Sequence, residues 1–306
     1  MATTSTARSV SAGGPGRSGG SPGSGARIGT TPLRTTWAAG RIVLGALLLR
    51  DLTVLRKHLF EFVVRTLIQP FLLVFVFLYV FPQIGQSVGG GAAGSAGFAT
   101  VLVPGVVGIS TMFQGVQAVA LQLSTEFGFT REIEDRVQAP CPVWLVAGSK
   151  VLFGLVQGLI AAVIVFPIAS VVHSPGVHAD FSINWAVVVT LLPLICLMFS
   201  SLGLLLGCVF EPRNIGLMFG FIVLPITFLG GTYYQWTRLA PVTVGGIHWL
   251  QVIVCLNPLI YANEGLRAGL THIDHMPLLA VYPVLVGFSA LFLVIGMRAF
   301  RGRVLS

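Results

Sequence analysis

The feature that most constrains this sequence is a stretch without a single Asp, Glu, Lys or Arg, which runs from Thr66 to Thr125. Six charged residues then crowd between Glu126 and Arg136, after which apolar sequence resumes. An unpaired charge costs several kcal/mol in the core of a bilayer. The uncharged stretch therefore belongs in lipid, and the charged cluster belongs in water.

The composition agrees with a polytopic membrane protein. Hydrophobic residues make up 55% of the chain and charged residues only 9%, with a mean hydropathy of +0.89, whereas soluble proteins carry roughly 25% charged residues. The net charge of +8 comes mostly from short segments beside apolar spans. Such placement sets membrane topology and argues against nucleic acid as a partner. The cysteines Cys141, Cys196, Cys208 and Cys255 show no zinc-ligand or disulfide pattern.

Six segments are long enough to cross a bilayer, which takes roughly 20 apolar residues. They predict an all-α polytopic membrane protein, and their even number places both termini on one side. All of the 18 Lys and Arg residues except Arg238 and Arg267 fall on that side, which we therefore expect to be the cytosolic side of the plasma membrane. The predicted spans are residues 62–81, 98–123, 143–172, 183–210, 215–233 and 277–297.

Three further segments flank or separate these spans. Residues 1–34 are rich in Gly, Ser, Thr and Pro and are expected to form a disordered cytosolic tail, with an organellar transit peptide as the alternative. Leucines recur at helical spacing within residues 37–61 and predict a helix in the membrane interface; a soluble helix packed on another subunit is the alternative. Residues 242–256 are apolar but too short to cross, so we expect them to dip into the membrane and return.

The sequence contains no P-loop and no hydrolase or metalloprotease motif. The interiors of the predicted spans hold essentially no ionisable residue, whereas carriers coupled to proton or sodium gradients usually need one. Energy for transport is therefore expected from a partner. Histidines and aspartates of the outward loops lack ligand spacing, so no metal site is expected.

Glutamines recur along the second predicted span, at Gln114, Gln117 and Gln122. Such amides either hydrogen-bond to neighbouring helices or face a translocation cavity. The sequence leaves both interpretations open.

The charged cluster after the second span has the spacing of a helix. Arg131 precedes Glu134 and Asp135 by three and four residues, and Glu132 precedes Arg136 by four. Prolines shortly afterwards would end such a helix. The pattern predicts a short cytosolic helix on which a partner docks, and the alternative is a charged turn that only sets topology.

Three motifs, in this order, resemble those of type-2 ABC export permeases. The stretch from Glu126 to Lys150 is similar to the cytosolic loop of that family. Gly-Gly-Thr-Tyr at residues 230–233 resembles the end of its fifth span, and Leu-Asn-Pro-Leu-Ile-Tyr at residues 256–261 resembles the signature before its last span. The resemblance extends from about residue 37 to residue 303. The overall character of the sequence, without a diagnostic motif, is similar to that of daunorubicin-resistance permeases.

The resemblance implies a six-span subunit that pairs with an identical or a sibling copy. Two separate cassette ATPases would drive it and would bind ATP and Mg, while this chain would bind no cofactor. The resemblance further implies an elbow helix at residues 37–61 and outer re-entrant helices at 242–256 and 259–270. The coupling helix to the ATPases would comprise Glu126, Arg131, Glu132, Glu134, Asp135 and Arg136, and the outer re-entrant motif would comprise Asn257, Pro258, Tyr261, Glu264 and Arg267.

Physical reasoning assigns roles to four residues of the outer motif. Pro258 cannot continue a helix, and Asn257 can bond to a backbone group exposed at the break. Glu264 and Arg267 lie three residues apart and are expected to pair near the outer headgroups; contact with substrate is the alternative.

The combined features predict a permease that exports a hydrophobic or amphipathic substrate, such as a drug or a lipid-linked molecule, and thereby supports antibiotic resistance. Membrane lipids would be its surroundings. A gradient-driven secondary carrier and a membrane assembly or scaffold protein are the alternatives.

Overall fold

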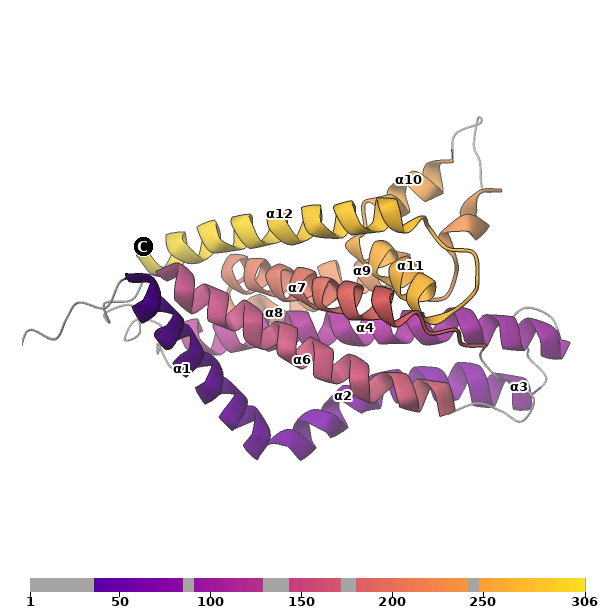
Figure 1. Ribbon diagram of the computed structural model, residues 1–306, viewed down its shortest axis with the longest axis horizontal. Helices are drawn as coiled ribbons and strands as arrows, with labels where there is room; N and C mark the ends of the chain where they lie inside the picture. Colours follow the sequence, from indigo (N-terminus) through magenta and orange to yellow (C-terminus); the bar gives the residue numbers. More distant parts are fainter. Residues whose placement is uncertain (1–35, 85–90, 129–142, 172–179, 242–247, 306) are drawn as a thin grey trace, which may run out of the picture.

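The computed structural model describes residues 36–84, 91–128, 143–171, 180–241 and 248–305. Within these ranges the regular structure is helical, and six helical stretches are long and apolar enough to cross a membrane (Figure 1). This confirms the predicted fold class. The six stretches are Leu59–Gln83, Gly97–Gly128, Val143–Ile168, Trp185–Val209, Pro212–Leu229 and Leu278–Val304.

Basic residues gather at one end of the helical bundle. We call it the basic end and define it by Lys150, Arg213, Arg298 and Arg301. The chain's last helix, α12 (Leu278–Leu305), finishes there, and the first helix begins there (Figure 1). The opposite end is called the far end. The predicted tail, residues 1–34, lies outside the described residues.

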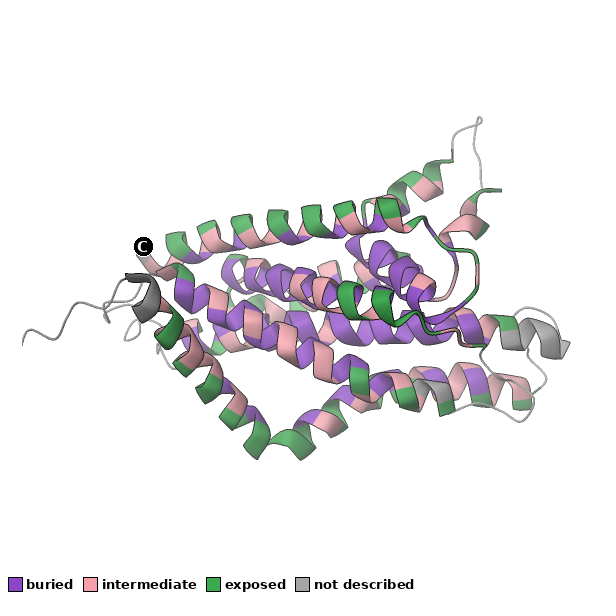
Figure 2. Cartoon of the chain, in the orientation of Figure 1, coloured by how far each residue is buried: buried purple, intermediate pink, exposed green. Residues whose placement is uncertain are grey.

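Helix α4 (Gly91–Gly128) forms the centre of the bundle and is its most buried spanning helix (Figure 2). It packs against α6 (Val143–Val171) and α7 (Trp185–Val209). Glycines permit the close approach: a Cβ on Gly203 of α7 would lie 2.8 Å from the Val116 carbonyl oxygen of α4. Small residues at such crossings let helix backbones touch, which is a main source of packing energy inside a membrane.

The N-terminal helix differs from its predicted range. Helix α1 (Thr36–Lys57) ends before His58, and α2 (Leu59–Val74) starts a new direction, so residues 59–61 belong to the first span and not to the helix predicted at 37–61 (Figure 1). The leucine stripe of α1 packs inward, because Leu55 is buried against Phe62 and Phe153. Helical periodicity continues across the break, which is why the sequence did not reveal it.

Two spans contain wide π-helical turns. The first continues from α2 through η1 (Phe75–Val80) to α3 (Phe81–Gln83). The fifth is composed of η2 (Pro212–Asn214), α8 (Ile215–Met218), η3 (Phe219–Val223) and α9 (Leu224–Leu229). Its π-turn ends two residues before Pro225, which has no N–H to donate. The helix stops four residues before its predicted end at 233, because Gly231 adopts a left-handed conformation with φ of 67°.

The far end is built from short elements between the fifth and sixth spans. They are η4 (Trp236–Leu239), α10 (Trp249–Cys255) and α11 (Pro258–Leu270). Helix α11 lies inside the bundle against α4, α7 and α12, and almost all of its residues are buried (Figure 2). Residues 242–247 of the predicted outer segment lie outside the described residues. That residues 242–256 dip into the membrane and return stays a prediction.

Candidate functional site

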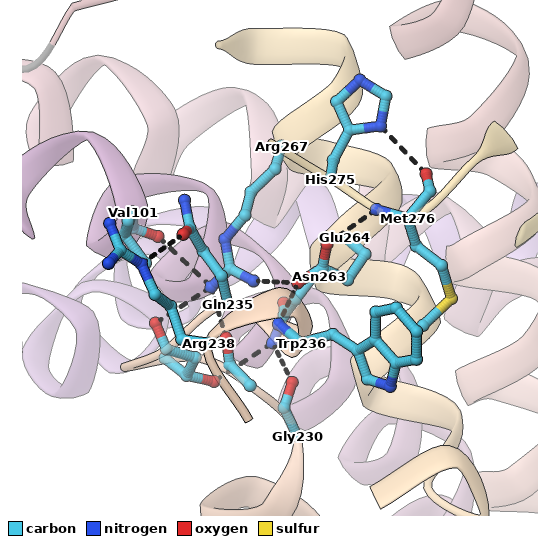
Figure 3. Close-up of polar contacts among 12 residues, drawn as sticks. Val101, Gly230, Gln235, Trp236, Arg238, Asn263, Glu264, Arg267, His275 and Met276 are labelled. Carbon is cyan, nitrogen blue, oxygen red and sulfur yellow. Dashed lines mark hydrogen bonds and ion pairs between the residues drawn. The ribbon is translucent and has the colours of Figure 1, made fainter. Parts of the chain in front are cut away.

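A buried carboxylate, Glu264 of α11, organises the far end (Figure 3). Its Oε1 accepts hydrogen bonds from the Trp236 backbone N–H at 2.9 Å and from Arg267 Nη1 at 2.7 Å. Its Oε2 accepts from the Met276 backbone N–H at 3.0 Å. One side chain therefore joins η4, α11 and the segment that leads into α12.

Arg267 completes this network from one turn further along α11 and is itself fully buried. Its Nη2 donates to the backbone carbonyl of Gly231, and to those of Thr232 at 3.4 Å and Val101 at 3.5 Å (Figure 3). Burial lowers the pKa of the guanidinium from its ordinary value, and the adjacent Glu264 carboxylate opposes that shift. The predicted pairing of these two residues is confirmed.

The Glu264–Arg267 pair is enclosed by protein. Neither side chain has any exposed surface, and the expected position of the pair near the outer headgroups stays a prediction. The backbone groups of Gly231, Trp236 and Met276 fold around the pair and take the place of water. A pair enclosed in this way positions the protein's own segments and does not present a surface to substrate.

The break before α11 has the predicted cap. The Asn257 side chain accepts from the Leu259 backbone N–H at 2.9 Å and donates to the Ile226 carbonyl at 2.7 Å, while Pro258 occupies the first helical position. The Tyr261 hydroxyl donates to the Cys255 carbonyl at 2.9 Å. Burial raises the pKa of Tyr261 to about 12, so the phenol keeps its proton. These bonds fasten α11 to α9 and α10.

Sequence reasoning missed Asn263, which precedes Glu264 and is fully buried. Its Nδ2 donates to the Gly230 carbonyl at 2.7 Å and to the Thr232 hydroxyl at 3.2 Å (Figure 3). The side chain lies so close to Gly108 of α4 that a Cβ there would collide with it. An amide within an otherwise apolar helical face was the available signal.

A second polar cluster lies at the basic end and joins three helices. Lys150 of α6 places its Nζ 2.7 Å from Glu126 Oε1 of α4 and 3.4 Å from Asp51 Oδ2 of α1. All three side chains are buried. Asp51 and Lys150 were not predicted as site residues, because nothing local in the sequence links two positions 99 residues apart.

Glu126 therefore differs from its prediction. It was expected to begin a separate, water-exposed coupling helix, but α4 continues to Gly128, and Glu126 is buried within its last turn against Lys150. A neutralising ammonium lets the carboxylate lie where an unpaired charge could not. The other predicted coupling residues, Arg131, Glu132, Glu134, Asp135 and Arg136, lie outside the described residues. Their coupling role stays a prediction.

A cavity of about 470 Å³ lies beside this cluster, between α1, α2, α4 and α6. A smaller cavity of about 170 Å³ continues along the seam between α2 and α4, and Arg65 and Gln117 line both. Gln114 lines the smaller cavity and Gln122 the larger one, and a role of these cavities in translocation stays a prediction. Neither amide oxygen has a hydrogen-bond partner in the described part of the chain.

The bundle and its two polar clusters define a polytopic helical membrane protein. Residues 43–271 match the family described as ABC-2 type transporter, and the chain belongs to this family. It is 32% identical over 238 residues to a protein of Escherichia coli K12 named "Inner membrane transport permease YadH", across 76% of this chain and 86% of that protein. A protein of the same name from Shigella flexneri matches to the same extent. The predicted resemblance to type-2 ABC permeases is confirmed, and the chain is a transport permease subunit.

Proposed function

We propose that this chain is the membrane subunit of an ATP-driven exporter that moves a hydrophobic or amphipathic substrate out of the cell. Two copies, or one copy and a sibling, would form the membrane part. A dimer of cassette ATPases would bind ATP and Mg at the basic end, which would face the cytosol together with both termini. The relatives' names support a transport permease, and the direction and the substrate are our inference.

The position of the larger cavity is the observation that carries this proposal. Exposed side chains of Arg50, His58 and Arg65 surround it, so it is open to the outside of the bundle. It lies at the end of the molecule where positive charge collects, the end that membrane proteins keep in the cytosol. A substrate that loads at this position is taken from the cytosolic side, which corresponds to export.

The distribution of charge supports an external source of energy. In the described spans, Asp, Glu, Lys, Arg and His occur only in the turns nearest the basic end. Buried ionisable groups along a span usually mark proton or sodium pathways, and the spanning middles offer none here. A companion ATPase that pushes on the segment from Arg131 to Arg136 would supply the work.

Reconstituted vesicles test this proposal. The chain, purified with the cassette ATPase that accompanies it, should transport a fluorescent amphiphile when ATP is added, and vanadate should stop transport. Reversing charge with Arg131→Glu and Arg136→Glu should reduce transport by tenfold or more, while Arg238→Glu at the far end serves as the matched control. Transport driven by a proton gradient without ATP, or unchanged transport in the double variant, would refute the proposal.

A further inference from the structure

Four buried polar atoms on α2, α4 and α6 have no hydrogen-bond partner within the described residues. They are the hydroxyl of Thr66 and the amide oxygens of Gln114, Gln122 and Gln157. Thr66, Gln114 and Gln157 are each more than nine-tenths buried. Leaving buried polar atoms without partners costs free energy, so native proteins satisfy them with a partner, a water or a ligand. These groups indicate that something polar occupies the seam.

The unpaired groups all line the two cavities. Thr66 of α2 and Gln114 of α4 both line the smaller cavity, and Gln122 and Gln157 line the larger one. Gln117 and Arg65 belong to both linings, so the two cavities adjoin along one side of α4. A single elongated molecule could therefore reach from the open rim to Gln114.

Charge is already balanced within this region. Lys150 bridges the buried carboxylates of Asp51 and Glu126, and together with Arg50 and Arg65 it sets three positive charges against the three carboxylates Asp51, Glu126 and Glu61. Deeper than the rim, the carboxylates of Asp51 and Glu126 are bonded to Lys150, and the Thr66 hydroxyl and the amide oxygens of Gln114, Gln122 and Gln157 are uncharged groups without a partner in the described part of the chain. Leu55, Phe62 and Phe153 supply the apolar part of the wall. Such a wall suits an apolar tail with an uncharged head, and Arg65, a cation in both linings, is exposed at the rim.

We propose that the α2–α4 seam binds the cargo directly, and that it selects an amphipathic molecule whose head is uncharged and carries hydroxyl or amide groups. This inference rests on the proposed function, since it names the substrate class of the exporter. A primary amide both donates and accepts, so three glutamines and a threonine can satisfy several hydroxyl groups of one head. Selectivity follows because a charged head that passes the rim would lose its hydration beside the uncharged side chains of Thr66, Gln114 and Gln157.

Photoreactive probes with one alkyl tail and three different heads test the proposal. An alkyl glucoside, an alkyl trimethylammonium and an alkyl phosphate would be bound to the complete complex in lipid nanodiscs, and saturable crosslinking would be measured. We expect the glucoside to bind most tightly. Exchanging Gln114→Leu and Gln157→Leu together should weaken its binding by about tenfold, the effect of losing two hydrogen bonds.

The matched control is Gln251→Leu on α10 at the far end, which should leave glucoside binding unchanged. Misfolding is not expected to confuse the result, because leucine is close in volume to glutamine and removes an unpaired polar group. The midpoint of thermal unfolding of the double variant should equal or exceed that of the wild type. Undiminished glucoside binding in the double variant, tighter binding of a charged probe, or no saturable glucoside binding would each overturn the proposal.

ATP-driven transport, measured on the same preparation, separates this inference from the proposed function. If the complex transports with ATP, and the Gln variants change neither binding nor transport, the seam is not the cargo site but the proposed exporter function still holds. If glucoside binding depends on Gln114 and Gln157 but no ATP-driven transport occurs, the binding site holds and the proposed exporter function fails.

Discussion

At the scale of single residues, the Glu264–Arg267 pair shows how one local spacing acquires a tertiary role. Two residues three positions apart on a helix can pair wherever the helix lies. Here the pair is fully buried, and it binds backbone groups of η4, of the Gly231 turn and of the segment before α12. Without the pair, these backbone groups would be left inside the protein without partners.

Removing one member of this pair should destabilise the protein strongly. Glu264→Ala would leave the Arg267 charge buried and uncompensated, which typically costs about 3–5 kcal/mol. Chemical unfolding of the purified protein in detergent would measure the change in free energy. Removing both charges, with Glu264→Ala and Arg267→Met, should recover part of the loss.

Glu61 provides the matched control for this experiment. Its side chain is 82% exposed, and its partner His58 lies 3.7 Å away, so Glu61→Ala should change the free energy of unfolding by less than about 1 kcal/mol. Equal losses for Glu264→Ala and Glu61→Ala would contradict the role assigned to the buried pair.

At the scale of elements, the crossing of α4 and α7 holds the bundle together. Gly203 and Gly207 lie one turn apart on α7 and face the α4 backbone, where a Cβ on Gly207 would lie 2.9 Å from the Ala120 Cα. This is the small-xxx-small arrangement of membrane helices, in which absent side chains allow close contact. The spacing was visible in the sequence, but the helix that it contacts was not.

Gly203→Ala should force α4 and α7 apart. Its nearest neighbours are backbone atoms of Gly115 and Val116, which cannot rotate out of the way, so we expect a loss of about 1–3 kcal/mol, as for other overpacked cores. The midpoint of thermal unfolding should fall accordingly. Gly287→Ala on α12 is the control, because nothing lies within 4 Å of its Cβ position. If both variants unfold at the same temperature, close packing at Gly203 is not what stabilises this crossing.

At the scale of the whole molecule, charge and polarity divide the protein into two ends with different tasks. The basic end holds the Lys150 cluster and the open cavity, and the far end holds the enclosed network around Glu264. α4 connects them, since it contributes Glu126 at one end and the Val101 carbonyl at the other. A movement at the basic end is therefore expected to reach the far end through α4.

Labelling of single cysteines would test which end faces the cytosol. In a chain without its native cysteines, Asp274→Cys at the far end should react with a membrane-impermeant maleimide in intact cells. Gly302→Cys at the basic end should react only after the membrane is opened, because basic residues are retained in the cytosol. Both positions are exposed in the structure. The opposite pattern would reverse the proposed direction of transport.

The sequence by itself determined the six spans, the pairing of Glu264 with Arg267 and the Asn257 cap, because hydropathy and spacing along one helix are local properties. Only the tertiary structure decided that His58 divides the N-terminal helix, that Lys150 joins Asp51 and Glu126, and that Gln114 and Gln122 line cavities. Each of these depends on how helices distant in sequence rotate and pack against one another. The same apolar residues suit a position that faces lipid and a position that faces another helix. The sequence therefore does not show which helices come into contact.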